Sequence, residues 1–281
     1  MTQSPASTCR DSIRPLRSGS VSLRLWKLAH KHGCWNPDAF DFAAERAHWA
    51  AQPAPRRTRL LHLLKAFRVG EESVAKNLIP LIAVVSSRGP SEDVLYLSSF
   101  LLDEAKHYYV TDRIAHAFSS REELDQIDVG AHTRILSEEV ESSLQALSTD
   151  DSVEAQVRAS VSYHLVVEGV QAGVAFAAIR HLIDASGRLA ALRSAFASME
   201  RDESRHIAFG MYFLRSQLRT AAEKALPAML SRVAELRPLL RAAEADFRTL
   251  LAGEDAVPVD AIINASRDRF ANRLKRLMDN H

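Results

Sequence analysis

The stretch Asp103-Glu104-Ala105-Lys106-His107 and its counterpart Asp202-Glu203-Ser204-Arg205-His206 carry the same short pattern, Glu-x-x-His. On an α-helix with about 3.6 residues per turn, positions three apart lie on one face. Glu104 with His107, and Glu203 with His206, can therefore each hold one metal ion from two sides. Two such units predict a site for two ions.

A paired-metal site in a helical bundle also takes one carboxylate from each of two further helices. The chain offers Glu71 before the first unit and Glu168 between the two units. The complete order is then Glu, Glu-x-x-His, Glu, Glu-x-x-His. This order predicts four helices that converge on one centre.

The composition favours one large helical domain. The chain has 281 residues, of which 47% are hydrophobic, with only 10 Gly and 10 Pro, so it is long enough to bury a substantial core. A formal net charge of +1 gives no electrostatic reason to expect a nucleic acid or a membrane surface as partner. We find no apolar run that reaches the length of a bilayer span. Two cysteines, Cys9 and Cys34, favour a cytoplasmic protein with free thiols.

The first 20 residues differ in composition from the rest of the chain. They are rich in Ser, Thr and Arg and nearly free of acidic residues, which is typical of flexible tails and also of organelle transit peptides. Pro5, Pro15 and Gly19 would interrupt the amphipathic helix that a transit peptide needs. We therefore expect a disordered tail over residues 1–20 and a single folded domain over residues 21–281.

Apolar periodicity places the six candidate ligands on the inner faces of helices. On the first helix, Glu71 lies on the apolar stripe between Phe67 and Val74, and the other five ligands lie on stripes in the same way. The expected helices cover residues 56–87, 92–118, 131–147 and 151 to about 183, with a new helix after Gly187 and later breaks at Pro227, Pro238 and Pro258.

Metal binding is the hypothesis that explains all four inward-facing carboxylates. A single Glu-x-x-His unit occurs by chance, and a lone carboxylate on an apolar stripe is usually paired locally. Four helices with the same feature are different, because burying four carboxylates without compensation costs several kcal/mol each. We see no comparable set of inward Lys or Arg, so metal ions are the expected counter-charge. Oxygen and imidazole ligands without a thiolate suit iron or manganese better than a structural zinc.

The pattern resembles the ferritin-like di-metal carboxylate superfamily. The 60 residues between His107 and Glu168 leave room for an extra helix, which is similar to the small subunit of ribonucleotide reductase rather than to ferritin or bacterioferritin. Segments 34–49, 70–74 and 163–169, with the two Glu-x-x-His units, resemble the ligand-binding oxidases that share the small-subunit fold. The resemblance covers about residues 20–215.

This resemblance implies an all-α, ferritin-like four-helix bundle with additional helices and a di-metal site in the bundle core. It implies a manganese/iron or di-iron centre that activates dioxygen, a homodimer, and a fatty-acid-like or other apolar ligand that is oxidised near the metals. In those oxidases a tyrosine oxygen becomes joined to a valine β-carbon by an ether cross-link. The matching residues in this chain are Tyr163 and Val74.

Two alternative functions belong to other classes. One is the radical-generating small subunit of ribonucleotide reductase, and the other is a non-catalytic iron-binding or ferroxidase bundle. The first is disfavoured because Thr111 stands one helical turn after His107, where the resemblance would place the radical tyrosine. The segment 273–281 also lacks the tyrosine-bearing tail that docks the large subunit.

The expected geometry differs between the two candidate oxidisable residues. Val74 follows Glu71 by three residues and so projects from the ligand face about one turn away. Tyr163 precedes Glu168 by five residues, roughly 140° around a regular helix, so it reaches the site only if that helix is distorted, for instance by a π-bulge. The alternative for both residues is ordinary core packing.

Asp103 and Asp202 each precede a ligand glutamate. Each could accept a hydrogen bond from a ligand histidine and fix its tautomer. Each could equally face the surface. The sequence leaves both roles open.

Overall fold

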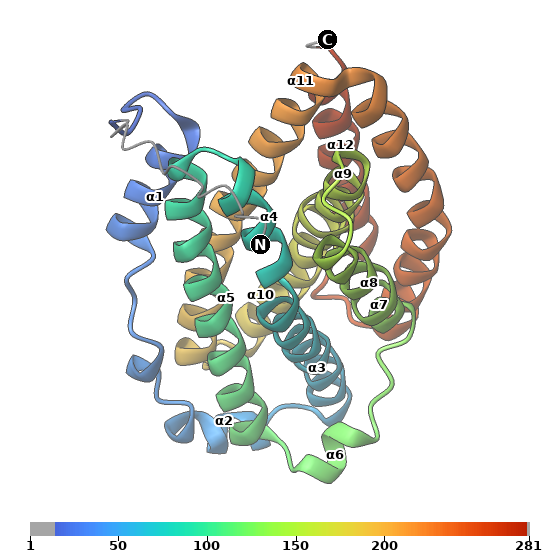
Figure 1. Ribbon diagram of the computed structural model, residues 1–281. Coiled ribbons are helices and arrows are strands. Elements are labelled where there is room, and N and C mark those ends of the chain that lie inside the picture. The colour runs from blue at the N-terminus through green and yellow to red at the C-terminus, as the bar shows by residue number, and fades with distance from the viewer. Residues whose placement is uncertain (1–14, 280–281) are drawn as a thin grey trace, which may run out of the picture.

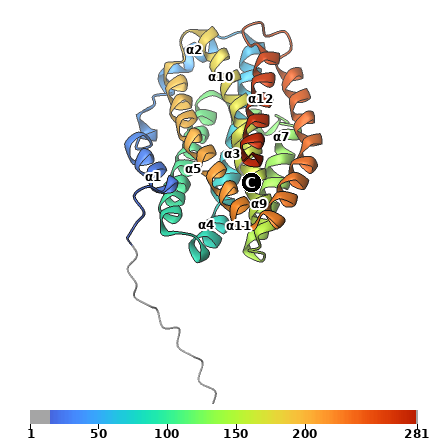
Figure 2. The ribbon, with the colours of Figure 1, turned by 90° about the horizontal axis from the view of Figure 1, so that it is seen from above.

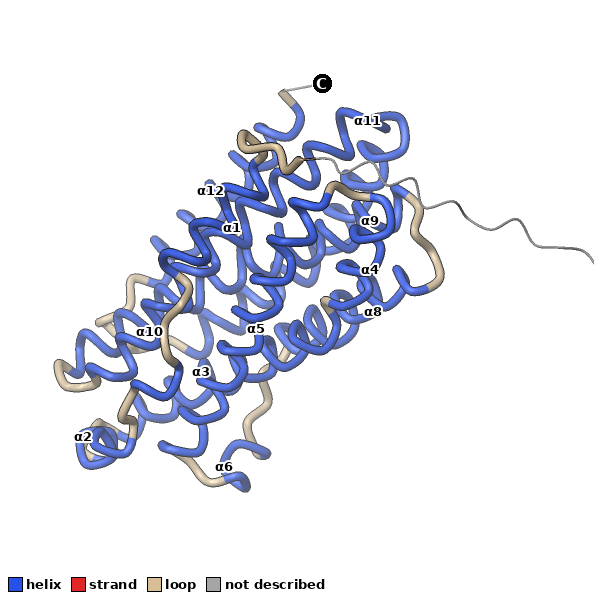
Figure 3. Tube along the Cα trace, turned by 60° about the vertical axis from the view of Figure 1, so that its left-hand side comes forward, coloured by secondary structure: helices blue, strands red, loops and turns tan. Residues whose placement is uncertain are grey.

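Helices form all the regular structure of residues 15–279, the part of the chain that the computed structural model describes (Figures 1 and 3). The elements are α1 (Val21–His32), the 3-10 turns η1 (Pro37–Ala39) and η2 (Ala43–Glu45), α2 (Arg46–Ala50), α3 (Ala54–Asn77), α4 (Ile79–Arg88), α5 (Ser91–Phe118), α6 (Arg121–Asp125), α7 (Ala131–Thr133), the π-helix η3 (Arg134–Val140), α8 (Glu141–Gln145), the 3-10 turn η4 (Ala146–Ser148), α9 (Val153–Ser160), the π-helix η5 (Val161–Ala172), α10 (Gly173–Ser186), α11 (Ala190–Leu250) and α12 (Val259–Met278). The predicted all-α fold is confirmed.

The candidate ligands lie between two clusters of buried apolar side chains. On α3, Phe67 belongs to one cluster and Val74 to the other, with Glu71 between them. On α5 the order is reversed, because Phe100 precedes the first Glu-x-x-His unit and Val110 follows it. The neighbouring helices α3 and α5 therefore run in opposite directions past a shared polar layer.

The other two ligand-bearing segments cross the same layer. Along η5 and α10 the chain passes from Val167 in one cluster to Phe176 in the other, and α11 returns from Met199 to Phe209. Helices α3, α5, α9–α10 and the first part of α11 thus form a four-helix bundle (Figure 2). Helices α5 and α9–α10 run in the same direction, so a long crossover connection joins them. The remaining helices add to it, as the ferritin-like prediction with extra helices requires.

Two predicted helix boundaries follow from local chemistry. The helix expected from residue 151 begins two residues later, at Val153, where the Ser152 side chain accepts a hydrogen bond from the backbone N–H of Ala155 and caps α9. Gly187 ends α10 with φ of 68°, a left-handed conformation that glycine adopts without a steric penalty. The predicted restart after Gly187 is confirmed.

The prediction of one continuous helix over residues 56–87 is wrong. The structure has two helices, α3 and α4, joined at Leu78. Pro80 is the second residue of α4 and has no N–H to donate to the preceding turn, and its ring crowds the carbonyl four residues earlier. The junction therefore lies where the proline ends the first hydrogen-bond ladder.

Two of the three predicted proline breaks are also wrong. Helix α11 continues through Pro227 and Pro238, and its non-helical residue is Ala221, with φ of −150° and ψ of 48°. Figure 1 shows the chain turning over within α11. Both prolines are on the exposed side, where water can satisfy the carbonyl that each one frees. Pro258 does precede a new helix, α12.

The stretch Val153–Ser186 contradicts the expectation that no apolar run is long enough to span a bilayer. The stretch has 34 residues and contains an 18-residue window with a mean hydropathy of 1.3, so it could cross a membrane by length and composition. However, 56% of that window is buried inside the molecule, and Glu168 lies within it. Its apolar character is that of a core helix.

The N-terminal predictions are only partly open to inspection. Residues 1–14, including Cys9, lie outside the described residues, and the tail and domain boundaries stay predictions. In the described part, the backbone N–H of Arg17 donates to Glu92. Cys34 is a free, exposed thiol, and the cytoplasmic location inferred from cysteine usage stays a prediction.

Candidate metal centre

Six buried side chains from four helical segments meet at the polar layer. They are Glu71 from α3, Glu104 and His107 from α5, Glu168 from η5, and Glu203 and His206 from α11. None is more than 7% exposed. The prediction that all six face the interior is confirmed.

The ligand atoms of these residues form two overlapping groups. One group contains Glu104, Glu168, Glu203 and His206, and the other contains Glu71, His107 and Glu203. Within each group the atoms lie within 4.8 Å of one another. Because Glu203 belongs to both groups, the arrangement suits two neighbouring ions that share a carboxylate.

The two Glu-x-x-His units are interleaved, which differs from the expectation that each unit holds its own ion. His107 Nδ1 lies 3.2 Å from Glu203 Oε1 but 4.0 Å from Glu104 Oε2. His206 Nδ1 lies 3.0 Å from Glu104 Oε1 and 3.5 Å from Glu203 Oε2. Helices α5 and α11 face each other across the centre, so the nearest carboxylate comes from the opposite helix.

Two aspartates face the outer nitrogens of the ligand histidines. His107 Nε2 lies 3.2 Å from Asp202 Oδ2 in a hydrogen bond, and His206 Nε2 lies 3.5 Å from Asp103 Oδ2 in a longer polar contact. Both aspartates are buried, so the surface-facing alternative is excluded. Each aspartate orients a histidine so that its Nδ1 points at the cluster.

Trp35 supports Asp202 from the segment between α1 and α2. Its Nε1–H donates to Asp202 Oδ2 at 2.7 Å. Its ring stacks on that of His107, with the centroids 6.2 Å apart and the planes 14° from parallel. Trp35 therefore fixes both the aspartate and the histidine that the aspartate orients.

Arg205 and Lys106 correct the expectation that inward basic residues are lacking. Arg205 is buried, and its Nη2 donates to Asp202 Oδ1 at 2.6 Å and to Asp103 Oδ2 at 2.8 Å. Lys106 Nζ lies 2.8 Å from Asp103 Oδ1. These two cations balance the two aspartates, so the charge of the four glutamates is left to the two histidines or to bound metal ions.

Tyr163 reaches the centre because its helix is widened. In a π-helix each N–H bonds to the carbonyl five residues earlier, so a residue five positions before Glu168 lies about one turn away. The fully buried Tyr163 hydroxyl donates to Glu104 Oε1 at 2.8 Å. The distortion that the sequence analysis required is present over Val161–Ala172.

The pKa values in the metal-free centre depend on burial and on the neighbouring charges. Burial raises the pKa of Glu71 to about 8 and raises the pKa of Glu168 well above its usual value. Burial also opposes ionisation of Glu203, but close polar contacts with Glu168 and both histidines lower its pKa well below the usual value. Burial alone would lower the pKa of His107, but the charge of Glu71, the hydrogen bond with Asp202 and the nearby Glu203 raise it well above the usual value.

The residues present fit a pair of metal ions. Four buried atoms that are good metal ligands have no hydrogen-bond partner among the described residues: Nδ1 of His107 and His206, and Oε2 of Glu168 and Glu203. All four belong to the cluster. Two divalent cations would satisfy them and match the charge of the four ionised glutamates.

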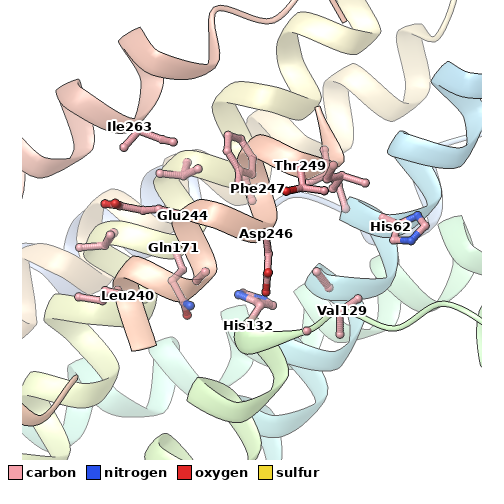
Figure 4. A pocket seen from close by; sticks show the side chains of 18 of the residues that line it. His62, Val129, His132, Gln171, Leu240, Glu244, Asp246, Phe247, Thr249 and Ile263 are labelled. Carbon is pink, nitrogen blue, oxygen red and sulfur yellow. The ribbon is translucent and has the colours of Figure 1, made fainter. Parts of the chain in front are cut away.

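A cavity of about 380 Å³ lies beside the centre, within the range of small-molecule sites. Figure 4 shows its lining from several helices, mostly apolar. A smaller cavity of about 40 Å³ is lined by Val74 and by Glu71, Glu104, Glu168 and Glu203. The two cavities share four lining residues, Ala66, His132, Gln171 and Ala175, so the larger space borders the smaller one.

Sequence reasoning missed Trp35, Arg205, Gln171 and His132 as functional residues. Arg205 had a usable signal, since it follows Asp202 by three residues within the second motif and so shares its helix face. Trp35 stands in the N-terminal motif, but nothing in its position indicates a bond to a residue 167 positions away. The two cavity residues carry no pattern in the sequence.

No protein-family model matches the chain. Among solved structures, the chain is similar to an R2-like ligand-binding oxidase in three variants, each with an aerobically reconstituted Mn/Fe cofactor. For a tyrosine-to-phenylalanine variant the TM-score is 0.82 at 26% identity, over 92% of this chain and 93% of that one. For a valine-to-isoleucine variant it is 0.83 at 25% identity, over 92% and 94%. For a glycine-to-phenylalanine variant it is 0.82 at 25% identity, over 93% and 98%.

These similarities span nearly the whole chain. They confirm the ferritin-like fold and the predicted resemblance to the ligand-binding oxidases that share the small-subunit fold. They extend the resemblance beyond the residues 20–215 on which it was first recognised.

Proposed function

We propose that this protein is a dioxygen-activating di-metal oxidase with a manganese/iron centre, or with two iron ions. The observation that carries the proposal is the pair of overlapping carboxylate and histidine groups, buried beside an apolar cavity. The similar R2-like ligand-binding oxidases hold a Mn/Fe cofactor. A ligand set of four carboxylates and two histidines suits either metal pair.

The bound metals would supply the redox chemistry that activates dioxygen. The chain's own residues determine where it takes place. Asp202 and Asp103 hold the two histidines with Nδ1 toward the centre, while Trp35, Arg205 and Lys106 fix the aspartates. Phe67, Val74 and Leu136 bound the small cavity and limit the water that enters it.

The substrate we propose is a fatty-acid-like or other apolar molecule. The larger cavity is lined mostly by aliphatic side chains and can hold a small apolar ligand. A carboxylate head would fit the small cavity next to the ligand glutamates, where the metals provide the positive charge that the protein lacks. The apolar chain would then extend into the larger cavity.

We further propose that the centre can oxidise its own protein, joining the Tyr163 oxygen to the Val74 β-carbon. The O–H bond of Tyr163 and the Cβ–H bond of Val74 break and one C–O bond forms, with dioxygen accepting two electrons and two protons. Support comes from the hydrogen bond of Tyr163 to Glu104 and from the place of Val74 in the small cavity.

Peptide mass spectrometry tests this proposal. Metal-loaded, oxygen-exposed protein should give a joined pair of peptides that contain Val74 and Tyr163 and lack two hydrogens. Metal-free protein and the Tyr163→Phe variant should give only separate peptides. If the metal-loaded wild-type protein also gives only separate peptides, the cross-link is excluded. Metal analysis and measurement of dioxygen uptake then decide whether the protein is an oxidase without the cross-link.

We also propose a homodimer formed through α1 and α5. These helices pack against each other (Figure 1), and they expose large apolar side chains at Leu28 and Leu102, which are 43% and 61% exposed. Small-angle scattering at micromolar concentration should give a dimer mass. Leu102→Glu should give a monomer, whereas Leu230→Glu on α11, also an exposed leucine, should not.

A further inference from the structure

Gln171 is a buried amide whose hydrogen bonds are unmade. It lies on η5, three residues after Glu168, and is 7% exposed. Neither its Nε2 nor its Oε1 has a partner among the described residues. A primary amide can donate two hydrogen bonds and accept two, and leaving such a buried group unmatched costs about 1–3 kcal/mol. Water or a bound ligand in the adjoining cavities is therefore expected to supply these bonds.

The position of Gln171 points to the ligand of the candidate oxidase. Gln171 is among the four residues that line both cavities, so it stands at the junction between the metal ligands and the larger apolar space. The other polar residue at this junction is His132, and Figure 4 shows both side chains at the edge of the larger cavity. The remaining shared residues, Ala66 and Ala175, cannot make side-chain hydrogen bonds.

Both polar groups at the junction are uncharged near neutral pH. Gln171 does not titrate, and burial lowers the pKa of His132 to about 4. Neither group offers the positive charge that would bind a carboxylate. The junction is therefore suited to a neutral group that donates or accepts hydrogen bonds, such as a hydroxyl or a carbonyl.

Cavity size fixes how far this neutral group lies from the head of the ligand. The small cavity measures about 40 Å³, and about 10–15 Å³ on this scale holds one water. The small cavity thus has room for a carboxylate and little more. The part of the ligand that passes Gln171 is then the first few carbons beyond the carboxylate.

We propose that Gln171, together with His132, selects ligands that carry a hydroxyl or carbonyl group near the carboxylate end, in preference to unsubstituted fatty acids. This inference rests on the proposed function, because it places the carboxylate in the small cavity. An unsubstituted chain would cover the amide with methylene groups and leave its donors and acceptor unmatched. A 3-hydroxy or 3-oxo acyl chain supplies the missing partner.

Binding measurements with two matched acids test the inference. Isothermal titration calorimetry of metal-loaded protein with decanoic acid and with 3-hydroxydecanoic acid should show about tenfold tighter binding of the hydroxy acid. Gln171→Leu and Gln171→Met, which keep the side-chain size, should remove or reverse this preference. Val174→Ala, which trims the apolar wall of the larger cavity, should weaken both acids alike and keep their ratio.

Metal content, measured in each preparation, distinguishes failure of this inference from failure of the proposed oxidase function. Wild-type protein that holds two ions and binds both acids equally, or binds neither, overturns the role of Gln171 and leaves the di-metal centre in place. The role of Gln171 is also overturned if Gln171→Leu keeps the wild-type preference for the hydroxy acid. Failure of the wild-type chain to load two ions contradicts the proposed oxidase itself.

Discussion

Helices α5 and η5 both deliver residues to the same centre, but they do so with different backbones. Helix α5 is a regular α-helix of 28 residues, and its Glu104 and His107 meet the centre at the ordinary spacing of three. Segment η5 is a π-helix of 12 residues, and it brings Glu168 and Tyr163, five positions apart, to the same place. A regular helix could not present both.

Contacts from distant parts of the chain accompany the wider turn. Arg273 Nη1 on α12 donates to the Gly169 carbonyl at 2.6 Å. Arg232 on α11 is buried and donates through Nε to Ser162 Oγ at 2.8 Å. It also donates to the Glu139 carbonyl, which lies on the other π-helix, η3. Helix α5, by contrast, is α-helical throughout Ser91–Phe118.

The largest expected effect comes from removing a ligand from either kind of helix. Glu104→Ala on α5, Glu168→Ala on η5 and His206→Ala on α11 should each abolish two-metal loading while the protein stays largely helical, because one lost ligand disables the site but removes little of the core. Elemental analysis with circular dichroism measures both. Glu72→Ala, which removes a partly exposed neighbour of Glu71, is the control. Two ions per chain in any ligand variant would contradict the assignment of that residue.

A smaller effect is expected from the aspartates that orient the histidines. Asp202→Asn should weaken metal affinity by about 10–100-fold, because it weakens the acceptor for His107 and Trp35 without removing a ligand. Competition with a chelator gives the affinity. Asp112→Asn, which changes a half-buried residue of α5 that pairs with Arg68 away from the centre, should leave it unchanged. If both variants bind metal like wild type, Asp202 is not needed to position the histidine.

Removing the buried Arg232 side chain tests whether its contacts stabilise the π-helical turn of η5. Arg232→Met should lower the free energy of unfolding by about 1–3 kcal/mol, because Ser162 and Glu139 lose a buried donor. It should also loosen metal binding through Glu168. Arg158→Met removes a more exposed partner of the same Glu235 and should cost less than about 1 kcal/mol. Chemical denaturation measures both, and equal losses would show that the buried contacts to η5 and η3 add nothing.

The smallest effect is the pH dependence of the metal-free protein. The pKa of Glu71 is raised to about 8 in the folded state, against about 4.3 in an unfolded chain. Between these values the folded protein keeps a proton that the unfolded chain has released, so stability falls as pH rises, by at most about 1.4 kcal/mol per unit for one such group. The raised pKa values of His107 and His206 act in the same direction above about pH 6.5.

Thermal unfolding of metal-free protein at pH 6.5 and pH 8 measures this dependence. The melting temperature should be lower at pH 8, and Glu71→Gln should reduce the difference because the amide does not titrate. Saturating metal should remove the trend, since the ions hold Glu71 in its ionised form. A melting temperature that rises from pH 6.5 to pH 8 without metal would contradict the raised pKa of Glu71.

The sequence by itself determined the set of candidate ligands and their burial. Period and spacing are local properties of a helix, so the stripe that contains Glu71 and the spacing of Glu104 and His107 can be read along the chain. The same logic gave the helical class and the restart at Gly187. The sequence did not predict the break at Pro80 or the continuation of α11 through Pro227 and Pro238. The effect of a proline on a helix depends on how the packing and the solvent treat the turn before it.

Only the tertiary structure decided how the ligands are shared and which residues surround them. His107 lies nearer to Glu203 than to Glu104 because helices α5 and α11 face each other across the bundle, and no local spacing encodes that contact. The bond from Trp35 to Asp202, the π-helical turn that brings in Tyr163, and the unmatched amide of Gln171 have the same origin. Each depends on side chains far apart in the sequence that come together only when the helices pack.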